Sequence, residues 1–114
     1  MQVTRFEDVW ENADKLVGTR VRVRGEYFSN GVAFVAADFD SCISGRRMRL
    51  QDGGSIEAHL LDILPAWGGG EFVYNELITV TGTVLRLGDD FELAALSDCT
   101  VTRADPEMSV DIPV

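Results

Sequence analysis

The sequence predicts a single mainly β domain, a five-stranded barrel with an N-terminal α-helix. Its 114 residues, 46% of them hydrophobic, suffice for one core and are too few for two domains. Eleven glycines separate short runs rich in Val, Thr, Phe and Tyr, a composition typical of short strands and tight turns. Apolar residues recur with period two along most of the chain and with a helical period only near the N-terminus. We therefore treat residues 1–114 as one domain.

The N-terminal helix is predicted over residues 5–16. Thr4 and Glu7 fit a capping box, in which each side chain bonds a free backbone N–H, and Gly18 would end the helix. An apolar stripe at helical spacing would bury one face: Phe6, Val9, Trp10 and Ala13.

The first hairpin follows from a change to period two at residue 20. Residues 20–28 and 32–37 are predicted to be strands, joined by a turn at Ser29-Asn30-Gly31, because Asn-Gly tolerates positive φ. Residues 38–45 are expected to form a loop.

A second hairpin is predicted at residues 47–51 and 55–60, around Asp52-Gly53-Gly54. A three-residue loop would place Leu50 opposite Ile56 and Arg49 opposite Glu57. Other loop lengths would mix apolar and polar residues on one face, which a half-buried sheet opposes.

The second half of the chain predicts a connection and then two strands. Residues 62–74 contain Pro65 and three consecutive glycines, which exclude a long helix. Leu77–Leu87 is the clearest strand, and a turn at residues 88–90 leads to a last strand with a break at Ser97-Asp98. Residues 104–114 form an acidic tail with two prolines, which we expect to be flexible.

Two segments resemble small bacterial OB-fold domains. Residues 16–25, LVGTRVRVRG, are similar to the opening of such domains, and residues 77–84, 91–93 and 98–101 are similar to their close. The pattern covers about half of the chain and resembles the anticodon-binding-like OB superfamily, whose members often bind single-stranded nucleic acid. Residues 29–74 depart from that pattern, because no clear helix is expected between the third and fourth strands.

Charge is distributed unevenly. The net charge is −9, which repels phosphate backbones and anionic lipid. Residues 20–49 nevertheless hold six arginines against three acids, whereas residues 50–114 hold twelve acids against two arginines. The basic block is therefore local.

The basic block suggests one candidate site, an arginine face that could hold a single strand of nucleic acid. If the strands present their polar sides together, Arg22, Arg24, Arg47 and Arg49 form one patch, and Phe28 could stack a base. The alternative is a solvated strand face whose arginines pair with acids such as Glu26 and Glu57.

The connection at residues 62–74 suggests the other candidate site. Trp67, Phe72 and Tyr74 lie on or beside a glycine-rich loop and could anchor a protein partner, with Glu71 and Glu76 meeting its basic groups. Alternatively, the aromatic side chains cap an open end of the barrel.

No motif indicates catalysis, a cofactor or a metal. Cys42, Cys99 and the single histidine, His59, lack metal-ligand spacing, and no nucleotide or nucleophile motif occurs. Asp38 and Asp40 are ordinary turn residues. Without a signal segment or a long apolar run, we expect a cytoplasmic protein with free thiols.

The sequence therefore favours a non-enzymatic binding module on an OB-like barrel. The leading expectation is a protein partner, which could be basic, as for an inhibitor or immunity-type protein, since opposite charge speeds encounter. The alternative is single-stranded nucleic acid bound through the arginine face.

Overall fold

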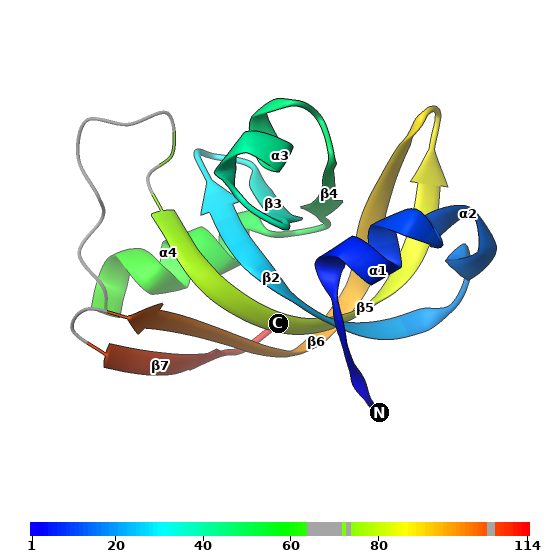
Figure 1. Cartoon of the computed structure of the whole chain (residues 1–114). Coiled ribbons are helices and arrows are strands. Elements are labelled where there is room, and N and C mark those ends of the chain that lie inside the picture. The colour runs from blue at the N-terminus through cyan, green and yellow to red at the C-terminus, as the bar shows by residue number, and fades with distance from the viewer. Residues whose placement is uncertain (64–71, 73, 105–106) are drawn as a thin grey trace.

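The computed structural model describes residues 1–63, 72, 74–104 and 107–114. It confirms a mainly β chain with a closed five-stranded barrel and an N-terminal helix (Figure 1). Around the barrel, each strand pairs with the next and the last pairs with the first: β2 (Arg20–Ser29), β3 (Ala33–Ala36), β4 (Arg47–Leu50), β6 (Asp90–Ala104) and β5 (Tyr74–Leu87).

Closure depends on the long strand β2. It pairs antiparallel with β5 over its whole length and with β3 through its last four residues, while β4 and β6 run parallel. Gly25 lies where β2 is most crowded, because a Cβ atom there would lie 2.7 Å from the Ala36 carbonyl oxygen and 3.1 Å from the Phe6 Cβ atom. The barrel is compatible with an OB-like fold.

Two predicted turns are confirmed, and one predicted break is corrected. Ser29 pairs with Ala33 across the first turn, where Gly31 has φ of 76°, and Leu87 pairs with Asp90 across the turn between β5 and β6. The break expected at Ser97-Asp98 is instead an irregularity within the single strand β6, where Asp98 has φ of 49°.

The N-terminal helix is present but divided. Helix α1 (Phe6–Glu11) and helix α2 (Ala13–Leu16) meet at Asn12, and three of the four predicted stripe residues, Phe6, Val9 and Ala13, are buried. The capping box was wrong: Thr4 belongs to strand β1 (Val3–Arg5), which pairs parallel with β2, and the cap position makes no side-chain hydrogen bond.

The loop expected at residues 38–45 contains a short helix. Helix α3 (Phe39–Ile43) begins after Asp38, whose carboxylate accepts a hydrogen bond of 2.8 Å from the backbone N–H of Ser41. This is an N-cap, a role that Asp fills as readily as a turn position. Figure 1 shows α3 beside β3.

The second hairpin was wrong, because residues 54–63 form helix α4 (Gly54–Ile63). Leu50 therefore does not face Ile56, and Arg49 lies opposite Phe34 and Glu92 instead of Glu57. Helix α4 lies between the third and fourth barrel strands in chain order, so the helix expected to be missing there is present.

The C-terminal tail contains a strand that the sequence analysis did not predict. Strand β7 (Glu107–Ile112) pairs antiparallel with the second half of β6. Thr100 donates a hydrogen bond of 2.9 Å to the Asp111 carboxylate across this pair. Within the described ranges, no helix is long and apolar enough to span a membrane.

Candidate binding surfaces

The four predicted arginines do not form one patch. Arg22 and Arg24 lie on β2 beside Thr81 and Thr79 of β5, whereas the other two lie on β4 beside β3. Phe28 is buried, with its ring centroid 5.2 Å from that of Phe72, so it offers no exposed surface to a base. The single arginine face expected from the sequence is therefore two separate surfaces.

On β4, one arginine is committed to the fold. The Arg47 guanidinium lies 4.2 Å from the centroid of the Phe34 ring and donates a hydrogen bond of 3.1 Å to the backbone carbonyl of Cys42 in α3. These contacts fasten α3 to the barrel. Arg49 is exposed and points from the same side of β4, where the buried Glu92 is its neighbour on β6.

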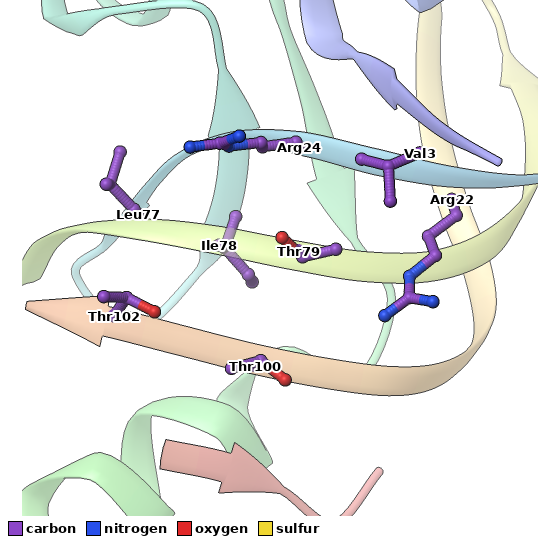
Figure 2. A pocket seen from close by; sticks show the side chains of 8 residues that line it. All are labelled: Val3, Arg22, Arg24, Leu77, Ile78, Thr79, Thr100 and Thr102. Atoms are coloured by element: carbon purple, nitrogen blue, oxygen red, sulfur yellow. The ribbon is translucent and has the colours of Figure 1, made fainter. Parts of the chain in front are cut away.

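On β2, the arginines line a groove of about 410 Å³, which we call the Arg22 groove (Figure 2). Its walls come from β1, β2, β5 and β6: Val3, Arg22, Arg24, Leu77, Ile78, Thr79, Thr100 and Thr102. Figure 2 shows the Arg22 guanidinium extending across β5 toward Thr100, while Arg24 extends toward Leu77. The Nε atom of Arg22 is buried and has no hydrogen-bond partner among the described residues.

Two of the predicted anchor residues are buried. Tyr74 is buried, and Glu76 is buried in an ion pair with Arg103, whose Nε lies 2.9 Å from the Glu76 carboxylate. Neither residue can be the exposed anchor that the sequence suggested. Phe72 is half-buried against Phe28, while Trp67 and Glu71 lie outside the described residues.

The structure instead exposes an apolar surface that the sequence reasoning missed. Val32, Phe39 and Ile43 are 43%, 41% and 51% exposed, and we call these residues together with Phe72 the α3 patch. The Phe39 and Phe72 rings lie 6.1 Å apart, and Phe72, Val32 and Ile43 line one groove. The available signal was that Phe39 and Ile43 occupy the predicted loop at residues 38–45, where no core contact was expected.

Acidic groups flank this patch on the α3 side. Asp38 and Asp40 are exposed on either side of Phe39. The hydrogen bonds from Ser41 hold the pKa of Asp38 below its usual value, so its negative charge persists to lower pH. Glu57 in α4 also lies close, because its carboxylate accepts a hydrogen bond of 3.1 Å from the backbone N–H of Gly31.

Both cysteines lie inside the fold. Cys42 and Cys99 are free and buried, so the loop position expected for Cys42 was wrong. Burial raises the pKa of the Cys99 thiol to about 12, with a smaller contribution from Asp111. Among the residues that the structure describes, no group of three or more His, Cys, Asp or Glu side chains could hold a metal ion.

Comparisons with protein-family models, curated proteins and solved structures give no match to this chain.

Proposed function

We propose that this chain is a non-enzymatic protein-binding module on an OB-like barrel and that the α3 patch contacts its partner. The observation that carries the proposal is the exposure of three large apolar side chains, Val32, Phe39 and Ile43. Val32 and Ile43 line one groove with Phe72, and the Phe39 ring lies 6.1 Å from the Phe72 ring. Single exposed apolar residues are common, but a contiguous group usually marks an interaction site.

The composition of the patch supports a protein partner. Phe39 and Phe72 present aromatic surface, and aromatic side chains are enriched among residues that dominate binding energy. The groove beside them, of about 330 Å³, is bounded by Asn30 and Arg47 and could accept one apolar side chain from the partner. The Phe28 ring packs beneath both aromatic rings and fixes their position.

The charge of the molecule favours a basic partner. A net charge of −9 attracts cationic surfaces over several ångströms and speeds encounter. Asp38 and Asp40 place part of that charge beside the patch. An inhibitor or immunity-type protein that blocks a cationic target is one form that this arrangement could take.

Single-stranded nucleic acid is the alternative, and fewer observations favour it. Of the four arginines in that prediction, Arg49 is exposed, and Arg22 and Arg24 line the Arg22 groove. They lie on different surfaces, the expected stacking residue Phe28 is buried, and the overall charge repels a polyanion.

A matched pair of variants tests the α3 patch, because Val32 and Val17 are both 43% exposed but only Val32 lines the groove. The wild type, Val32→Asp and Val17→Asp are each used to capture partners from the native host, with recovered protein and nucleic acid both identified. We expect a specific, basic protein with the wild type and Val17→Asp. Val32→Asp should weaken its binding by about tenfold or more, as expected for an anchor position.

Three results would contradict the proposal. Equal loss of binding in both variants would show that the loss is not specific to the α3 patch. Unchanged binding by Val32→Asp would place the interface elsewhere. Recovery of oligonucleotide that nuclease removes, with no retained protein, would favour the alternative. Thermal unfolding of each variant establishes that the fold is intact, since exposed substitutions usually change stability by no more than about 0.5 kcal/mol.

A further inference from the structure

We propose that the Arg22 groove binds the oxyanion group of a small ligand, a phosphate or a carboxylate. In this assignment the Arg22 guanidinium makes the principal charged contact. This site lies on β2, β5 and β6 and is separate from the α3 patch, so it does not depend on the proposed function.

Arg22 carries a hydrogen-bond donor that has no acceptor among the described residues. The buried Nε atom of Arg22 has no hydrogen-bond partner in the described part of the chain. Buried polar atoms are nearly always bonded, and an exception calls for a ligand, an ion or a water. An oxyanion is the natural acceptor, since a guanidinium offers parallel N–H groups that match its oxygens.

Other arginines in the same sheet show that the fold can satisfy this side chain. Arg20, two residues earlier on β2, donates hydrogen bonds to Thr83 and to Ser97, the latter at 2.6 Å. Arg103 on β6 pairs with Glu76. Arg22 belongs to the same barrel, yet its Nε atom has no hydrogen-bond partner among the described residues.

The groove also combines positive charge, hydroxyl groups and apolar walls. Arg24 contributes another positive charge, and Thr79 contributes a hydroxyl between the two arginines along β5 (Figure 2). Leu77 and Val3 supply apolar surface beside these groups. A groove of about 410 Å³ with convergent polar groups and apolar walls fits a small organic anion better than a bare ion.

Two acids, Asp98 and Asp111, share a neighbouring groove with Arg22. The Asp111 carboxylate of β7 accepts the hydroxyl of Thr100 at 2.9 Å. No ion pair joins Arg22 to an acid in the described ranges. Removing the Asp111 charge should strengthen anion binding, because it removes a repulsion of the anion and removes no contact with it.

The test follows the Nε–H signal of Arg22 by NMR while inorganic phosphate or acetate is added to the full chain. Sodium chloride at equal ionic strength is the reference. We expect a saturable shift with at least one oxyanion, and the tighter of the two identifies the ligand as a phosphate or a carboxylate. The Nε–H signals of arginines outside the groove, including that of the exposed Arg49, should follow the chloride reference.

Variants separate a site from general charge attraction. Arg22→Lys should lower the affinity for the tighter-binding probe by about tenfold or more, because an ammonium cannot reproduce the guanidinium hydrogen bonds. Asp111→Asn should raise the affinity for the same probe. Arg49→Lys, which alters an exposed arginine on another surface, is the matched control and should change nothing.

Three results would overturn the assignment. The first is a shift that does not saturate and equals that in chloride. The second is equal weakening of binding by Arg22→Lys and Arg49→Lys. The third is a single-stranded oligonucleotide that displaces phosphate and binds far more tightly, since the ligand would then be a polyanion. The Val32→Asp variant should titrate as the wild type does, so failure of the α3 patch proposal would leave this result unaffected.

Discussion

Two strands carry the same Arg-apolar-Arg pattern, but their arginines make different contacts: Arg22-Val23-Arg24 on β2 and Arg47-Met48-Arg49 on β4. In both, the middle side chain is buried in the barrel and the arginines lie on the outer side. On β4, Phe34 and the end of α3 surround the first arginine and bind it. On β2, the first arginine faces threonines and keeps an unpartnered Nε atom. Alternation decides which side an arginine takes, and the neighbouring elements decide whether it supports the fold.

The difference lies in what the neighbours offer. Helix α3 directs the Cys42 carbonyl at Arg47, so a backbone acceptor is fixed at 3.1 Å. Beside Arg22, β5 and β6 present hydroxyls, of which that of Thr100 already donates to Asp111. On β4, the chain itself supplies a hydrogen-bond acceptor for Arg47. On β2, the Nε–H of Arg22 remains a donor that a ligand could bind.

The largest expected effect concerns Arg103, the arginine most fully committed to structure. Glu76→Ala should lower the free energy of unfolding by about 3–5 kcal/mol, because it leaves a buried guanidinium without its carboxylate. Urea denaturation measures this loss. The double variant Glu76→Leu with Arg103→Met should lose less, since no unpaired charge remains. A loss below about 1 kcal/mol for Glu76→Ala would show that Arg103 is not held by this pair.

A smaller effect is expected on β4. Arg47→Met should lower the free energy of unfolding by about 1–3 kcal/mol, because it removes the hydrogen bond to Cys42 and the contact with the Phe34 ring while keeping apolar bulk. Arg49→Met, at an exposed position on the same strand, should stay within about 0.5 kcal/mol in the same denaturation experiment. Equal losses would remove the structural distinction between these neighbours.

The smallest effect is expected in the Arg22 groove, and its sign is the useful result. Arg22→Met should leave the free energy of unfolding unchanged or raise it by up to about 1 kcal/mol, since it removes a buried donor without a partner and keeps the packing of the side-chain stem. The measurement is denaturation in chloride buffer without phosphate. A loss above about 1 kcal/mol would mean that Arg22 supports the fold as Arg47 does, and the comparison would fail.

Much of the barrel could be predicted from local patterns. Strand β5 places Ile78 and Val80 in the core and Thr79 on the outer side, as its alternation predicts. The turns around Gly31 and Gly88 follow from residues that adopt positive φ without strain. These features need only the chain itself and a sheet with one buried face.

Helix α4 could not be predicted from the local sequence pattern. Ile56 and Leu60 are four residues apart, which fits one face of a helix and equally the alternate positions of a strand. Packing resolves the ambiguity, since a Cβ atom on Gly53 would lie only 2.4 Å from that of Ala33, so the chain turns closely against β3 before the helix begins. Strand β7 is a similar case, because its acidic sequence has little strand character and its pairing with β6 supplies the missing stability.

By itself, the sequence determined the mainly β class, the N-terminal helical stripe and the outer position of Arg22, Arg24, Arg47 and Arg49. These depend on periodicity, which is a property of consecutive residues. Only the tertiary structure decided that Tyr74 and Glu76 are buried, that Val32 and Ile43 share an exposed patch, and that Arg22 and Arg47 face different surroundings. The physical reason is that partners come from distant segments: Arg20 meets a hydroxyl 77 residues away, and Arg103 a carboxylate 27 residues away. Strand register and barrel closure bring such groups together, and neither is encoded in the spacing of neighbouring residues.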